Sequence, residues 1–139
     1  MEKKTCPYCH LTDDPEQQII FENEMCAYIQ KASEQTILEG SGLIVPKRHV
    51  SDVFGLTENE WRDTQELLLK AKAYLEERYD HEGYSVGWNT GEVGGQSIMH
   101  AHLHIIPRFA DEPFAGKGIR YWIKQDENAR IMHRMSTKL

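Results

Sequence analysis

The sequence predicts one small α+β domain, because strand-like segments surround a single strong helix. Residues 18–30 read as two apolar runs separated by a short polar turn, which is a hairpin pattern. Residues 57–79 carry apolar side chains at helical spacing, and residues 97–106 alternate as a strand. The chain has 139 residues, and two independent cores of half that size would bury their apolar surface poorly. We therefore treat residues 1–139 as one domain.

The hairpin consists of residues 18–22 and 26–30, and it carries Cys26, which we expect to be a buried small apolar side chain. Leu43-Ile44-Val45 predicts a third strand, which Pro46 stops.

The helix is predicted to begin at Thr57, because Thr57 and Glu60 have the spacing of a capping box. Residues 84–88 then alternate as a strand, and residues 89–96 hold three glycines, which is typical of a loop that closes around a ligand.

The tail, residues 109–139, has a weaker pattern, and residues 120–132 predict one amphipathic helix. We expect the imidazoles of His81 and His133 to face solvent.

Composition narrows the functional classes. No apolar run approaches the roughly 20 residues that cross a bilayer, and the N-terminus has no apolar segment of a secretory signal. We therefore expect a cytoplasmic protein without a membrane partner. The formal net charge of −6 disfavours a nucleic-acid partner bound through a broad basic surface.

Three histidines alternate with apolar residues at the end of the chain's clearest strand pattern. In a strand, His100, His102 and His104 share one face and the intervening apolar residues occupy the other. Histidine has no strand propensity that explains three in five positions. Two chemical interpretations stay open at this point, namely a catalytic three-histidine metal centre and a group of imidazoles that contacts a phosphate.

The segment from Asn89 to Arg108 resembles the signature of the histidine-triad family. The core of that signature is three histidines that alternate with apolar residues and are followed by two further apolar residues. Residues 27–29 and 43–49 also resemble the family, so the likeness covers roughly residues 6–108. The resemblance implies a five-stranded antiparallel sheet with a helix packed on it. It also implies a homodimer in which the two sheets join into one.

The resemblance implies a function as well: His102 attacks the α-phosphorus of a purine nucleotide, and the resulting nucleotidyl-histidine is hydrolysed or its nucleotidyl group is transferred, as in a nucleotidyl transferase. His104 lies against phosphate oxygens, Gln96 and Ser97 bind the phosphate or the leaving group, and Asn89 lies near phosphate and ribose. The glycine loop, with Gly95, is expected to offer backbone N–H donors to the phosphoryl oxygens.

The leaving group stays open, because two features of the sequence point to different branches of the family. Gly94-Gly95-Gln96-Ser97 resembles the nucleoside phosphoramidases, which we place slightly ahead, whereas Pro107-Arg108 resembles the dinucleoside polyphosphate hydrolases. A nucleotide-binding regulatory protein with negligible turnover is a third interpretation. The intact triad favours an enzyme.

Cys6 and Cys9 have the spacing of a zinc knuckle within an N-terminal arm, residues 1–10. Zinc-bearing members of the family, which this chain resembles, complete a structural zinc site with the equivalents of His49 and His100. Two other interpretations of Cys6-Pro7-Tyr8-Cys9-His10 are a c-type haem attachment motif and a redox dithiol. The first lacks an export signal, and the second lacks the strand that normally precedes the motif.

Gln30 occupies the position where most nucleotide-binding members of the family carry an acidic residue on the ribose. A carboxamide offers one neutral acceptor there in place of a carboxylate, so we expect weaker or altered ribose recognition. Glu34 is the candidate replacement if its loop bends back.

Overall fold

The computed structural model describes residues 2–133, and the chain divides into two units, Met1–Phe109 and Ala110–Leu139. The first unit holds strands β1 (Gln17–Glu22), β2 (Cys26–Lys31), β3 (Gly42–Pro46), β4 (Gly83–Trp88) and β5 (Leu103–Arg108) and helix α1 (Glu58–Arg78). Two 3₁₀ segments, at Lys3–Thr5 and Leu11–Asp13, precede β1, and two more, at Ala32–Glu34 and Val53–Gly55, lie between the later elements.

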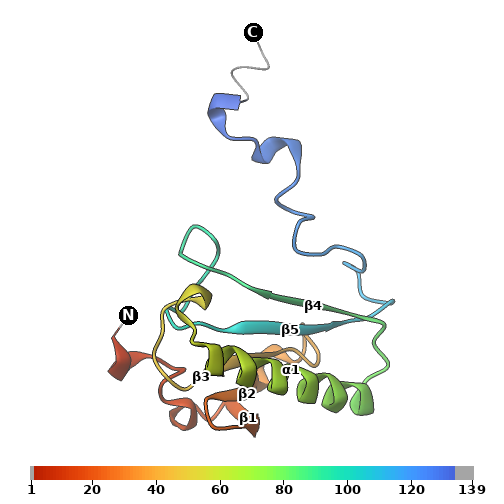
Figure 1. The fold of residues 1–139 in the computed structure, drawn as a ribbon. Coiled ribbons are helices and arrows are strands. Elements are labelled where there is room, and N and C mark those ends of the chain that lie inside the picture. Colours follow the sequence, from red (N-terminus) through yellow and green to blue (C-terminus); the bar gives the residue numbers. More distant parts are fainter. Residues whose placement is uncertain (1, 134–139) are drawn as a thin grey trace. The chain divides into compact units, whose positions relative to one another are not determined.

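The five strands form one antiparallel sheet in the order β1-β2-β3-β5-β4, with α1 lying across one face (Figure 1). The predicted fold class is therefore confirmed. The predicted hairpin is β1-β2, and a register shift between Ile19 and Phe21 interrupts its ladder. β4 and β1 are the two edges of the sheet, and β5, which carries His104, lies between β3 and β4.

Helix α1 begins where the capping pattern predicts. Thr57 accepts a hydrogen bond from the backbone N–H of Glu60, and the Glu60 carboxylate accepts one from the backbone N–H of Thr57. Glu60 is buried, and Arg48 donates two further hydrogen bonds to its carboxylate. The helix start is thus tied to the segment that follows β3.

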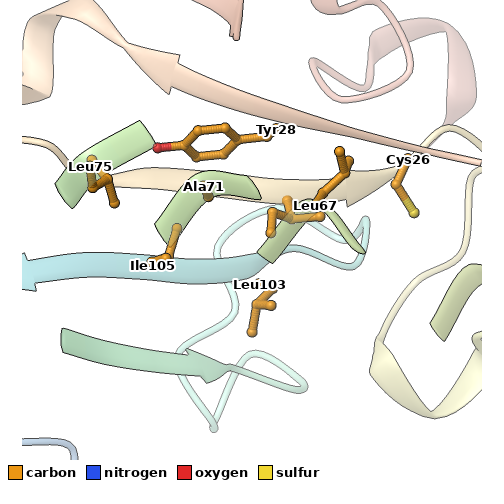
Figure 2. Close-up of a cluster of buried hydrophobic side chains, with 8 residues drawn as sticks. Cys26, Tyr28, Leu67, Ala71, Leu75, Leu103 and Ile105 are labelled. Atoms are coloured by element: carbon orange, nitrogen blue, oxygen red, sulfur yellow. The ribbon is translucent and has the colours of Figure 1, made fainter. Parts of the chain in front are cut away.

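The main core lies between α1 and the sheet (Figure 2). Leu67, Ala71 and Leu75 of the helix pack against a set of strand residues that includes Cys26, Tyr28, Ile44, Leu103 and Ile105. All eight are at most 4% exposed, and Cys26 is buried as expected. The alternation in β5 follows from this packing, because Leu103 and Ile105 face the helix and His104 consequently faces the other side of the sheet.

Three predictions about local structure are wrong. The strand predicted over residues 97–106 is confined to Leu103–Arg108, since the Ala101 N–H donates to the carbonyl of Val50 outside the sheet ladder. Residues 120–130 form turns and a 3₁₀ segment at Asp126–Asn128, and helical residues begin only at 131, in place of one helix over 120–132. The side chain of His81 is only 1% exposed and packs edge-on against Tyr84, whereas His133 is exposed as expected.

Within residues 2–133, no helix combines the length and the apolar character that crossing a membrane requires.

Candidate active site and metal site

The three histidines come from two kinds of local structure. His104 lies in β5, whereas His100 and His102 lie in the irregular segment that enters the strand. The rings of His102 and His104 are in contact, with centroids 5.0 Å apart. His100 and His102 are buried and His104 is partly buried, so these side chains form a semi-enclosed group on the sheet face opposite α1.

One hydrogen bond fixes the chemical state of His102. Its Nδ1 lies 2.8 Å from the backbone carbonyl oxygen of His100, and because a carbonyl only accepts, Nδ1 carries the proton. Burial lowers the pKa of His102 below its usual value, which keeps the ring neutral near pH 7. A neutral ring protonated at Nδ1 has a free lone pair at Nε2. His102 is therefore built as a nucleophile or a base.

His104 offers a polar atom to a ligand. Its Nε2 is buried and, among the described residues, has no hydrogen-bond partner. Burial lowers the pKa of His104, and positive charge on His102 lowers it further. A buried, unpaired ring nitrogen is costly, and a catalytic role or a bound water or ion is among the usual reasons for one.

The glycine loop is held by its own hydrogen bonds. The N–H groups of Gly94, Gly95 and Gln96 donate to carbonyls of Gly91 and Glu92 inside the loop. Gly91 and Gly95 have φ of +76° and +97°, which other residues rarely adopt. The N–H of Gly95 is thus bonded inside the loop in this conformation, and its expected contact with a phosphate stays a prediction.

Gln96 joins this loop to the rest of the site. Its side chain is buried; Nε2 donates to the carbonyls of Ser51 and Ile98, and Oε1 accepts from the N–H of Gly91 at 2.9 Å. Asn89 and Ser97 are exposed on either side of the loop, and the Asn89 amide lies next to Gly95. Asn89 and Ser97 are thus available to a ligand, whereas the Gln96 amide hydrogens are already used.

The structure does not bring Gln30 to this group. On β2, Gln30 follows Cys26 and Tyr28 at two-residue spacing, so it lies on the helix side of the sheet, opposite His104. Its Nε2 donates to the Tyr28 hydroxyl and to the carbonyl of Gly40. In this geometry Gln30 bonds within the chain, and its expected ribose contact stays a prediction.

Cys6, Cys9, His49 and His100 converge as predicted. Their donor atoms lie within 4.8 Å of one another, with Cys6 Sγ–His100 Nδ1 at 3.3 Å, Cys9 Sγ–His49 Nδ1 at 3.1 Å and the two Nδ1 atoms at 3.2 Å. A tetrahedral zinc ion with normal bond lengths separates its ligand atoms by about 3.3–3.8 Å. These four residues could therefore hold a metal ion.

His100 is prepared for such a role on its other side. Its Nε2 donates to the carbonyl of Pro46 at 2.7 Å, which leaves Nδ1 unprotonated and directed at the thiols. Burial lowers the pKa of His100 to about 4, so the ring stays neutral. In the part of the chain that the structure describes, the potential metal cluster includes neither His102 nor His104, which disfavours the three-histidine metal centre.

Tyr8 is a neighbour of the triad that was not predicted from the sequence. Its ring lies between the two cysteines in sequence and contacts the rings of both His102 and His100, with centroids at 5.2 Å and 5.8 Å. The sequence feature that could have indicated this contact is the position of Tyr8 between Cys6 and Cys9. If both cysteines share a metal site with His100, the residue between them lies near the triad.

Comparison with known proteins agrees with this geometry. The HIT domain model matches residues 13–111, which is well over half of the chain. The chain belongs to the HIT family. A HIT family protein from Bacillus anthracis has a crystal structure with a TM-score of 0.71 at 25% identity, covering 96% of this chain and 92% of that one.

Two curated HIT relatives are named as enzymes. A bis(5'-adenosyl)-triphosphatase of Dictyostelium discoideum is 35% identical over 72 residues, which cover 52% of this chain and 48% of that protein. A bis(5'-nucleosyl)-tetraphosphatase of Schizosaccharomyces pombe is 33% identical over 72 residues, covering 52% and 40%. This chain thus matches about half or less of each of these relatives.

Proposed function

We propose that this HIT protein is a nucleotide hydrolase that cleaves a phosphoramidate or phosphoanhydride bond at the α-phosphate of a purine nucleotide. The hydrogen bond from His102 Nδ1 to the carbonyl of His100 carries the proposal, because it leaves Nε2 with a free lone pair. An imidazole in this tautomer is a competent nucleophile at neutral pH.

The reaction has two steps. In the first, His102 Nε2 forms a bond to the α-phosphorus while the bond from phosphorus to the leaving amine or phosphate breaks, and the leaving group takes up a proton as it departs. In the second, water attacks the same phosphorus, the P–N bond to His102 breaks, and a nucleoside monophosphate is released. The carbonyl of His100 stabilises the positive charge on the ring between the two steps.

The neighbouring residues bind the phosphate and the leaving group and hold the glycine loop in place. His104 directs its buried Nε2 at phosphate oxygens, and the exposed side chains of Ser97 and Asn89 contact the leaving group and the phosphate–ribose region. Gln96 acts as a positioning residue that holds the loop through its three hydrogen bonds, and Gly95 supplies the turn that the loop requires.

Dinucleoside polyphosphates are the first substrates to test, because two relatives are named for hydrolysing them. Adenosine phosphoramidates are the second. Turnover of either by wild-type protein, lost in His102→Ala with the fold intact, supports the proposal. Wild-type turnover that persists unchanged in His102→Ala contradicts it. Nucleotide binding without turnover in the wild type selects the regulatory alternative.

We further propose that the ion held by Cys6, Cys9, His49 and His100 is structural zinc. Two thiols and two imidazoles form a closed tetrahedral set, and the hydrogen bond from His100 Nε2 to the carbonyl of Pro46 orients the ring as the ligands of such sites are oriented. When bound, zinc cross-links the N-terminal arm to the segment that carries His102 and leaves His102 free. A reducing compartment such as the expected cytoplasm would keep these thiols available to the ion.

A second copy of the chain is the proposed partner at the β4 edge. Val86 on this edge strand is 40% exposed, and a groove of about 450 Å³ between α1 and β4 is lined by Trp61, Leu68, Trp88 and neighbouring residues. Pairing of two β4 strands covers this apolar surface and removes an exposed edge. Light scattering at micromolar concentration tests this dimer. We expect the mass of a dimer for wild type and of a monomer for Val86→Arg, and a monomeric wild type would contradict the proposal.

A further inference from the structure

Among residues 2–133, Tyr8 is the one aromatic side chain whose ring contacts both the metal-ligand residue His100 and the nucleophile His102. It lies between Cys6 and Cys9, whose donor atoms both belong to the cluster with His49 and His100. The turn is also held by the main chain, because the Cys9 N–H donates to the carbonyl of Cys6 and Gln17 Nε2 donates to the carbonyl of Pro7. The backbone of Tyr8 is therefore fixed on both sides.

The ring of Tyr8 reaches from this turn to both histidines. It meets His102 at a centroid distance of 5.2 Å and a tilt of 58°, and it meets His100 edge-on at 5.8 Å and 84°. Both distances fall within the range of favourable aromatic pairs. Tyr8 also packs on the apolar cluster formed by Ala27, Ile29 and Val45, on the sheet face that carries His104.

The orientation of His102 depends on few contacts. The hydrogen bond to the carbonyl of His100 fixes one edge of the ring, and the contact with His104 is the other aromatic neighbour among the described residues. A single hydrogen bond still allows the imidazole plane to tilt about the donor. A second ring packed at an angle against the imidazole restricts that tilt, and small misplacements of a reacting atom cost up to about 100-fold in rate.

We propose that Tyr8 is a positioning residue for the nucleophile: its ring, held by the metal-ligand turn, braces the His102 imidazole so that Nε2 faces the α-phosphorus. The inference rests on the proposed role of His102. The Cys-x-x-Cys arm then has two roles: its ligands stabilise the fold, and the side chain between them orients His102 for the reaction.

The first test compares Tyr8→Leu, Tyr8→Phe and wild type in the same hydrolysis assay. Tyr8→Leu keeps an apolar side chain but removes the ring, so we expect kcat to fall about 10- to 100-fold with KM changed less than about threefold. Tyr8→Phe restores the ring and is expected to rescue kcat relative to Tyr8→Leu. Leu11→Ala, in the same apolar cluster, is the matched control and is expected to keep kcat within about twofold.

Two further measurements separate positioning from other roles. Zinc content and thermal stability of Tyr8→Leu show whether the loss of rate is only a loss of folded, metal-loaded protein. NMR of ¹³C-labelled histidine, with the His102 signal assigned from His102→Ala, reports the ring directly. The His102 C–H signals are expected to shift in Tyr8→Leu and to return toward the wild-type position in Tyr8→Phe.

Three outcomes overturn the inference: unchanged kcat in Tyr8→Leu, a loss confined to KM, or a loss of kcat fully explained by missing zinc with unmoved His102 signals. The failure of the underlying function looks different, because turnover then survives in His102→Ala itself. If His102→Ala is inactive and Tyr8→Leu has wild-type kcat, only the role of Tyr8 is wrong.

Discussion

Replacing Arg48 with methionine tests how the helix start is anchored beside the metal-ligand segment. Arg48 donates two hydrogen bonds to the carboxylate of Glu60, from Nε at 3.0 Å and from Nη2 at 2.8 Å, and a third to the carbonyl of Gly55. The Glu60 side chain is 3% exposed and the Arg48 side chain 50% exposed. The substitution leaves a buried carboxylate whose remaining described partner is the backbone N–H of Thr57.

The expected loss is about 2–3 kcal/mol. Removing one partner of a fully buried ion pair costs about 3–5 kcal/mol, and the half-exposed arginine lets water reach one side of Glu60, which reduces the cost. For a chain of this size the entropy of unfolding is near 0.3 kcal/mol per kelvin, so the melting temperature is expected to fall by about 8 °C.

Urea unfolding followed by circular dichroism and tryptophan fluorescence measures this loss. Lys47→Met is the matched control, since Lys47 pairs with Glu22 at an exposed position, and it is expected to cost less than about 0.5 kcal/mol. An Arg48→Met protein as stable as this control would refute the reasoning.

The pH dependence gives a second check on the same pair. Hydrogen bonds from Arg48 lower the pKa of Glu60 below its usual value. Since the folded-state pKa is depressed, the contribution of the carboxylate is fully present above the unfolded value of about 4.3 and is lost as pH falls through the folded value. The stability difference between wild type and Glu60→Gln is therefore expected to shrink as the pH falls below about 4.

Three further substitutions test the site. Cys9→Ser is expected to lower the zinc content measured by elemental analysis, while zinc retained in full would place the ion elsewhere. His104→Ala is expected to reduce kcat by about 10²–10⁴-fold without unfolding the protein, and unchanged kcat would remove His104 from the site. Gln96→Leu removes three hydrogen bonds, so we expect it to lower the free energy of unfolding by about 1–3 kcal/mol and to lower kcat/KM as well. Wild-type values of both quantities would contradict the positioning role of Gln96.

Local patterns predicted the parts of the fold that local physics decides. The hairpin and the capped helix follow from alternation and from the Thr57–Glu60 spacing, and both are present. The segment before Leu103 was predicted as strand because its apolar and polar residues alternate. This pattern does not show that the N–H of Ala101 bonds to Val50 instead of a neighbouring strand, or that His100 points toward the cysteines. The failed helix prediction in the tail relied on weak periodicity interrupted by glycines.

The sequence predicted which residues belong to the site more accurately than it predicted which residues contact one another. The Cys/His cluster could be proposed because four good metal donors are rare together. Gln30 was placed by alignment with the family pattern, but the burial of Cys26 and Tyr28 fixes the pleat of β2 and turns Gln30 toward the helix. Tyr8 was missed because its partner His102 lies 94 residues away and nothing in the local sequence records that contact.

The covalent intermediate is the most direct test of the proposed mechanism. Wild-type protein is mixed with a dinucleoside polyphosphate or adenosine phosphoramidate labelled at the α-phosphate, the reaction is quenched within milliseconds, and peptides are analysed by mass spectrometry under conditions that preserve phosphoramidates. We expect a nucleotidyl group on His102 that is absent in His102→Ala and that decays as the nucleoside monophosphate appears. Turnover with no label on the protein, or label on a residue other than His102, would contradict it.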